Sequence, residues 1–421
     1  MDGSPSQTGT GRGQFHGEIT APMTSWLGDW ANLLLRWTHF IAGIAWIGSS
    51  FYFIWLDRAL TRPAGAPPPR PGVEGDLWMV HSGGFYQVEK RRPGPGEIPP
   101  VLHWFKYEAL FTWITGIALL VLVYYLTGAY LLDPGVSAIG RGTAMAIGIG
   151  VLVLGWVVYD LLWRSPLAKR ERVAAVISLT LLALVSFGMC RLVSGRAAFM
   201  HVGSLLGTIM VANVWVRILP AQQQMLEATR AGRAADFTLG EHAKVRSVHN
   251  SYMTFPLLFI MLSNHFPATY ANPQNWLVLL LLFVAGAAVR HAMIGHGASS
   301  RWALVPAALA LAAAMFISTP KGTAAQSASS AADSIPPFYA VRAVIEQRCQ
   351  PCHSQYQSDR TFGPAPGGVT FDTPESIVRL APRIRVRVVE TRTMPLANKT
   401  GMTDAERQLL ARWLQVGAPL R

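Results

Sequence analysis

Long apolar runs, separated by loops rich in Arg and Lys, organise most of this chain. Eight runs are close to the length of about 20 residues that a helix needs to cross a bilayer. They cover residues 37–56, 110–132, 142–159, 173–190, 197–216, 248–264, 274–289 and 302–318. The pattern predicts an all-α fold, in which an eight-span transmembrane helical bundle is followed by a small all-α domain.

The composition sharpens this division. The chain is 51% hydrophobic and 14% charged, whereas soluble domains are about 25% charged. We therefore expect a polar N-terminal segment at 1–25 without a removable signal peptide. A membrane domain at 26–319 and a flexible Ala/Ser-rich linker at 320–336 should follow, then a C-terminal domain at 337–421. Within the first long loop, 57–104, residues 77–88 predict a β-hairpin that turns at the glycines.

The C-terminal domain contains the motif Cys349-Gln350-Pro351-Cys352-His353. C-x-x-C-H attaches a haem c through two thioethers, and the adjacent histidine becomes the proximal iron ligand. The alternatives are a redox dithiol or half of a zinc site. A zinc site needs a second ligand pair, yet the only other cysteine, Cys190, lies in an apolar run. The motif therefore predicts one covalent haem c and a class I-like cytochrome c domain.

A second axial ligand for that haem is expected downstream. Met394, followed by a proline that stiffens its loop, is the favoured candidate, and Met402 is the alternative. Residues 338–348 predict the helix that leads into the haem motif. Thr403 and Glu406 have the spacing of a capping box, which predicts the start of a last amphipathic helix.

The basic residues predict the membrane topology. The net charge of +13 is compatible with nucleic-acid binding, but the basic residues gather between apolar runs. Haem c is attached on the periplasmic side, so eight spans place both termini there. Eighteen Lys and Arg then fall near the inner side, and only Arg141, Arg191 and Arg196 near the outer side. This agrees with the positive-inside rule. The expected location is the bacterial inner membrane, as a multi-pass protein with no nucleic-acid partner.

Ionisable residues inside apolar runs are costly and often functional. His39 and His201 occupy matching places in the first and fifth runs, so they could ligate a non-covalent haem b; helix packing is the alternative role. His249, Asn250 and Arg246 gather near the inner end of the sixth run. Such groups suit a flat, anionic, hydrogen-bond-rich molecule. For Arg246, anchoring a helix to the inner leaflet is the alternative.

Five segments together resemble the bacterial integral-membrane urate oxidase (urate hydroxylase) family. They are Arg36-Trp37-Thr38-His39, Ser82-Gly83-Gly84-Phe85-Tyr86-Gln87-Val88-Glu89-Lys90, Leu102-His103-Trp104-Phe105-Lys106-Tyr107-Glu108, Ala243-Lys244-Val245-Arg246-Ser247-Val248-His249-Asn250 and Ser263-Asn264-His265-Phe266-Pro267. Ser82 departs from the family's pattern, which has a third glycine in that loop.

The resemblance implies an eight-span domain fused to a cytochrome c, which oxidises urate to 5-hydroxyisourate in purine catabolism. Electrons would leave through the cytochrome to a periplasmic cytochrome or terminal oxidase, and no peroxide would form. Two alternatives use the same elements. One is a membrane-anchored electron-transfer cytochrome subunit of a respiratory chain, and the other is a transporter with a fused redox sensor.

Overall fold

The computed structural model describes residues 17–61, 70, 72–126, 130–295, 300–319, 335–359 and 365–421, with side chains from residue 27 onward except at Ala397. Most of these residues are helical, as the apolar periodicity predicts. Most of the predicted N-terminal segment (1–25) and of the predicted linker (320–336) lies outside the described residues.

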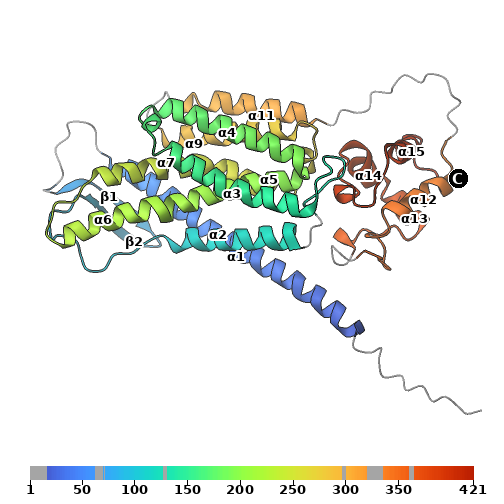
Figure 1. Cartoon of the computed structure of the whole chain (residues 1–421), viewed down its shortest axis with the longest axis horizontal. Helices are drawn as coiled ribbons and strands as arrows, with labels where there is room; N and C mark the ends of the chain where they lie inside the picture. The colour runs from blue at the N-terminus through green and yellow to red at the C-terminus, as the bar shows by residue number, and fades with distance from the viewer. Residues whose placement is uncertain are drawn as a thin grey trace, which may run out of the picture.

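A bundle of helices forms the larger part of the molecule (Figure 1). Each of the eight predicted apolar runs lies largely within a helix. The bundle consists of α1 (Gly17–Leu60), α2 (Tyr107–Leu120), α3 (Arg141–Leu162), α4 (Glu171–Leu192), α5 (Gly195–Ala212), α6 (Leu219–Arg230), α7 (Thr238–Ser263), α8 (Pro267–Tyr270), α9 (Asn275–Ile294) and α11 (Leu304–Ser318), with π-helical continuations η1 (Val121–Leu126) and η3 (Asn213–Ile218) and the 3₁₀ turn η2 (Pro166–Lys169).

Six helices of the described part are long and apolar enough to cross a membrane. They are Leu27–Leu60, Tyr107–Leu126, Arg141–Leu162, Glu171–Leu192, Gly195–Arg230 and Asn275–Ile294. The helix α11 is apolar but has only 15 residues, and α7 begins with a polar half that includes Glu241, Lys244 and Arg246. The first helix also begins at Gly17 rather than near residue 37. Several spans are therefore supported, while the count of eight stays a prediction.

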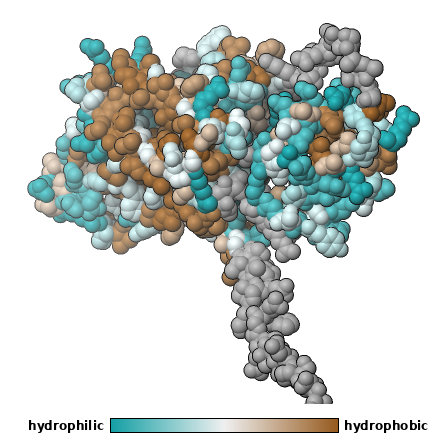
Figure 2. Space-filling model, turned by 45° about the vertical axis from the view of Figure 1, so that its right-hand side comes forward, coloured by the Kyte–Doolittle hydropathy of each residue, from teal (hydrophilic) through white to brown (hydrophobic). Residues whose placement is uncertain are grey.

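The bundle is apolar outside as well as inside. Large side chains such as Leu154, Leu184 and Leu309 are more than half exposed, and Figure 2 shows hydrophobic residues gathered over the bundle. Inside, α5 contacts α2, α3, α4 and α7. Gly203 allows the close approach of α7, because a Cβ there would lie 2.7 Å from Ile260 Cγ2. An apolar exterior around a packed interior is what a lipid environment favours.

The predicted hairpin is present. Strands β1 (Val73–His81) and β2 (Gly84–Arg91) pair antiparallel, with His81 opposite Gly84. The two turn residues, Ser82 and Gly83, both have positive φ, at 49° and 79°, which is the conformation of a type I′ hairpin turn. Serine adopts a positive φ at some cost in strain. The turn nevertheless forms with Ser82 at its first position.

The C-terminal residues form a separate helical unit at the end of the bundle opposite the hairpin (Figure 1). The predicted helix α12 (Phe338–Arg348) is confirmed, and so is α15 (Asp404–Gln415), which starts at the Thr403–Glu406 capping box. Between them lie η4 (Pro366–Gly368), α13 (Pro374–Arg379), α14 (Ala381–Ile384), η5 (Arg385–Glu390) and η6 (Leu396–Asn398). Val341, Leu410 and Trp413 are fully buried in its own core.

Candidate functional site

A buried carboxylate joins three helical segments near one end of the bundle. Asp160 of α3 is 4% exposed. Its Oδ1 accepts from Arg217 Nε at 2.8 Å and from Arg246 Nη2 at 3.1 Å, and its Oδ2 accepts from Arg217 Nη2. Since Arg217 lies on η3 and Arg246 on α7, one carboxylate holds these segments together. Arg246 therefore binds a neighbouring helix, which replaces its alternative role as a leaflet anchor.

A hydrogen-bonded network of polar side chains continues from this carboxylate into the bundle. The Tyr159 hydroxyl lies 2.8 Å from His249 Nδ1, and Asn213 Nδ2 donates to the Tyr159 oxygen at 3.1 Å. Asn213 Nδ2 also donates to Asn250 Oδ1 at 2.9 Å, and Asn250 Nδ2 donates to the carbonyl of Met210. Because Tyr159 accepts from Asn213, its own proton is directed at His249 Nδ1, which leaves a proton on Nε2.

The three predicted site residues, His249, Asn250 and Arg246, are thus brought together in one network. Only Asn250 lines a cavity, of about 70 Å³, which it shares with Trp46 and Ser50 of α1 and with Thr254. This volume holds a few water molecules. It is well below the roughly 300 Å³ at which sites for small organic ligands begin, so the cavity holds water as it stands, and a bicyclic ring could enter only if the surrounding helices moved apart.

The network carries spare positive charge and spare hydrogen-bonding capacity. Two arginines share one carboxylate, and Arg246 Nη1 and Asn213 Oδ1 are buried without a hydrogen-bond partner among the described residues. Burying such groups unpaired is costly. Arg246 Nη1 can therefore donate to a negatively charged group nearby, whereas Asn213 Oδ1 can accept from an N–H or O–H group.

Tyr159, Asp160 and Asn213 were not among the predicted site residues. The only signal for them in the sequence is a polar residue within or at the end of an apolar run, and many such residues merely pack.

The structure does not bring His39 and His201 together. His39 Nδ1 lies 2.9 Å from the carbonyl of Thr112 and 3.1 Å from the Thr115 hydroxyl. His201 is fully buried, with Nε2 at 2.9 Å from the Tyr125 hydroxyl and Nδ1 at 2.7 Å from the carbonyl of Ala197. Thr115 and Tyr125 are ten residues apart on α2 and η1, about 15 Å of helix. Each imidazole therefore contacts a different level of this helix and serves in helix contacts here, so the structure lends no support to a haem b held between the two.

The residues of the C-x-x-C-H motif fit a haem c. His353 Nδ1 lies 3.0 Å from the carbonyl of Val369; that contact orients the ring and leaves Nε2 available to an iron, the usual arrangement of a ligating histidine. Both Cys349 and Cys352 are free thiols. Met394 packs at the edge of the unit's core, whereas Met402 is 3% exposed inside it. The choice of Met394 over Met402 as the second axial ligand stays a prediction.

The environment of the two thiols argues against the alternative chemistries. Burial, with the neighbouring Cys352 thiol, raises the pKa of Cys349 to about 12. A redox dithiol works through a thiolate of lowered pKa. Within the described part of the chain, no group of three or more His, Cys, Asp or Glu side chains gathers to hold a metal ion, so a zinc site lacks its remaining ligands there.

Fold and site together define a helical protein with membrane-type apolar helices, a buried arginine–carboxylate network and a C-terminal unit that carries C-x-x-C-H. The chain belongs to the urate oxidase N-terminal family, whose profile matches residues 25–319. The match supports a urate-related function and oxidoreductase activity. No curated protein and no solved structure matches the chain in these comparisons.

Proposed function

We propose that this protein is a membrane urate oxidase that converts urate to 5-hydroxyisourate and passes the electrons to a haem c in its C-terminal unit. The family match over residues 25–319 carries this proposal. The C-x-x-C-H motif, with the orientation of His353, supplies the electron acceptor. The proposed setting is the bacterial inner membrane, with both termini in the periplasm, in accordance with the distribution of basic residues.

The reaction consumes urate and one water, and it releases 5-hydroxyisourate, two electrons and two protons. A hydroxyl group is added at a ring carbon, so the site has to bind an anion, position a water and accept protons. When bound, haem c supplies a one-electron acceptor, so the two electrons leave one at a time.

Each task has a candidate in the buried network. Asp160 pairs with both Arg217 and Arg246, so its one negative charge leaves part of their positive charge unbalanced. Arg246 therefore favours the urate anion. Asn250 faces the small cavity together with Ser50 and Thr254, where a water can be held for attack on the ring. His249 and Tyr159, hydrogen-bonded to each other at 2.8 Å, can take up and pass on a proton. In the C-terminal unit, Cys349, Cys352, His353 and Met394 would hold the haem.

The test is the visible spectrum of the full-length protein, purified in detergent, before and after urate is added without oxygen. We expect c-type bands that become reduced with urate, and about two haems reduced for each urate consumed. An Asn250→Ala variant should lose this reduction while ascorbate still reduces its haem. A wild-type spectrum that urate leaves unchanged would refute the proposal and favour an electron-transfer subunit.

A further inference from the structure

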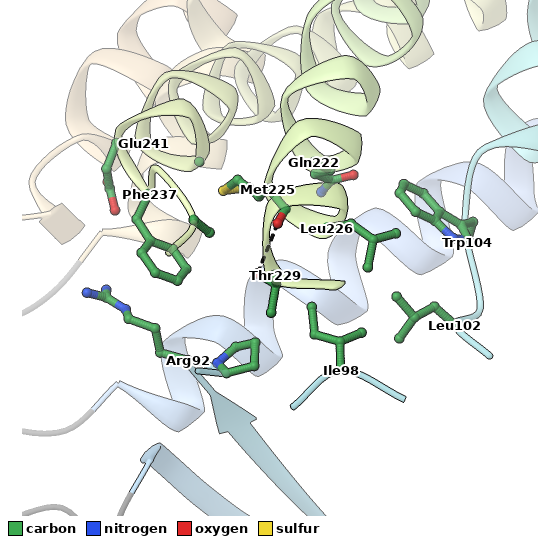
Figure 3. Close-up of a pocket in the computed structure, with 13 residues that line it drawn as sticks. Arg92, Ile98, Leu102, Trp104, Gln222, Met225, Leu226, Thr229, Phe237 and Glu241 are labelled. Carbon is green, nitrogen blue, oxygen red and sulfur yellow. Dashed lines mark hydrogen bonds between the residues drawn. The ribbon is translucent and has the colours of Figure 1, made fainter. Parts of the chain in front are cut away.

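A larger cavity, of about 310 Å³, lies at the end of the bundle that carries the hairpin. Figure 3 shows its walls, which come from the loop after β2, from α6, from the turn that leads into α7 and from the first turn of α7, which carries Glu241. None of the residues predicted for the site lines it. Its volume is at the lower end of the range for small-ligand pockets, about 300–1,000 Å³. It is therefore the one of the two cavities with room for a bicyclic molecule.

The loop that forms one wall is fixed in place. Gly96 N donates to the carbonyl of Thr229 on α6 at 2.8 Å, and Arg230 Nη2 donates to the carbonyl of Pro100 at 2.9 Å. Gly96 has a φ of 81°, which glycine adopts without steric cost. These contacts hold residues 92–104 against α6, so the cavity is a built feature of the fold.

The lining combines flat apolar walls with a few polar groups. Trp104, Leu226 and Phe237 provide apolar surface. Arg92 lies with its Cζ 4.9 Å from the centre of the Phe237 ring and forms an ion pair with Glu74, with 2.9 Å between Nε and Oε1, so its Nη groups remain as donors toward the cavity. Gln222 adds an amide that both donates and accepts.

This lining matches one chemical class of ligand. A planar heteroaromatic ring buries its faces against apolar walls, and its edge of alternating N–H and C=O groups pairs with an amide and a guanidinium. Glu241, which also lines the cavity, supplies a carboxylate that can accept from ring N–H groups. An oxidised purine has all of these properties, whereas a lipid acyl chain would make no use of the hydrogen-bonding groups of Gln222 and Glu241.

We infer that this cavity is a loading site that binds urate from the aqueous side before urate reaches the network around Asn250. The inference rests on the proposed function and adds to it a second subsite for the same substrate. One continuous helical stretch, η3 followed by α6, connects the two places: it carries Asn213 and Arg217 of the network and Gln222 and Leu226 of the cavity.

Binding can be measured separately from turnover. Full-length protein in detergent is dialysed against radiolabelled urate without oxygen and with excess ascorbate, so that its haem stays reduced and electrons cannot leave. Ala235 lines the cavity and lies outside any helix, whereas the exposed Ala234 does not line it. Ala235→Trp should fill the cavity and weaken urate binding at least tenfold, while the matched control Ala234→Trp binds like the wild type.

A second pair of variants tests the polar contact. Gln222→Leu should weaken binding about three- to tenfold, the equivalent of one hydrogen bond. Gln224→Leu, an exposed position on the same helix that does not line the cavity, should leave binding unchanged. In turnover measurements, the cavity variants should raise KM without changing kcat.

Several results would overturn the loading site. One is wild-type affinity for urate in Ala235→Trp, and another is an equal loss of urate affinity in Ala234→Trp. A third is phospholipid that co-purifies with the wild type and is absent from Ala235→Trp, while Ala235→Trp still binds urate. Failure of the proposed function looks different, because the wild-type haem would then not be reduced by urate, whatever the dialysis shows.

Discussion

Replacing Asp160 with asparagine tests whether one carboxylate holds α3, η3 and α7 together at this end of the bundle. In the wild type, the Asp160 carboxylate accepts three hydrogen bonds from Arg217 and Arg246, which lie on different helical segments. Asparagine keeps a single acceptor oxygen and directs an NH₂ group at a guanidinium. At least one of the charge-assisted bonds is lost, and Arg246, whose side chain is 7% exposed, is left without a counter-charge.

The expected cost follows from this burial. Removing one partner of a buried ion pair costs about 3–5 kcal/mol, because the remaining charge stays desolvated. Since asparagine retains one acceptor and Arg217 is 30% exposed, we expect the lower end, about 3 kcal/mol. That corresponds to roughly a hundredfold change in the unfolding equilibrium.

The matched control is Arg164→Gln. Arg164 also approaches Asp160, at 3.8 Å, but its side chain is 58% exposed, so its loss should cost about 0–1 kcal/mol. The measurement is reversible unfolding in mixed micelles with increasing SDS, followed by tryptophan fluorescence. If Asp160→Asn proves as stable as Arg164→Gln, then Asp160 does not hold α3, η3 and α7 together, and the account of the network is wrong.

Three further predictions address the other parts of the protein. Met394→His should lower the haem reduction potential in a redox titration, because imidazole favours ferric iron more than a thioether does; an unchanged potential would move the ligand to Met402. Burial works to raise the pKa of the Glu406 carboxyl, but hydrogen bonds from Thr403 and Arg348 outweigh it and lower the pKa below its usual 4.5. That stabilisation is present above pH 4.5 and is lost as pH falls through the lowered pKa. Glu406→Gln should therefore destabilise the C-terminal unit by about 1–2 kcal/mol at pH 7, and Soret-band circular dichroism during unfolding should show the difference vanish in acid. Tyr159→Phe removes the contacts with Asn213 and His249 and should slow urate-dependent haem reduction, whereas Tyr124→Phe, whose hydroxyl is 3.4 Å from Asn264, should not.

Local signals in the sequence predicted the elements well. The Thr403–Glu406 spacing gave the start of α15, and the glycines after residue 81 gave the hairpin turn, because capping and turn chemistry act within a few residues. Helix lengths were harder to predict. The apolar run at 197–216 is about as long as a membrane span, yet the helix continues through η3 to Arg230. The sequence did not predict this continuation, because the residues after 216 are largely polar and extend no apolar run.

The site was predictable only in part. His249, Asn250 and Arg246 share a short segment of one helix, so their spacing alone placed them together. Tyr159 and Asn213 join them from other helices, and no single-sequence pattern specifies which faces of three helices meet. The pairing of His39 with His201 could not be judged from the sequence for the same reason. His39 and His201 have similar neighbours in sequence, but the helices that carry them contact different levels of α2 and η1.

The π-helical segment η3 fixes the length of chain between Asn213 and Gln222. Each residue added to or removed from an α-helix rotates everything beyond it by about 100°. A single deletion in the first turn of α6, between η3 and Gln222, would therefore turn Gln222 and Leu226 away from the loop at 92–104, while Asn213 kept its bond to Asn250. Substitutions in this stretch can be absorbed one side chain at a time, but a change in its length would separate the two places in a single step.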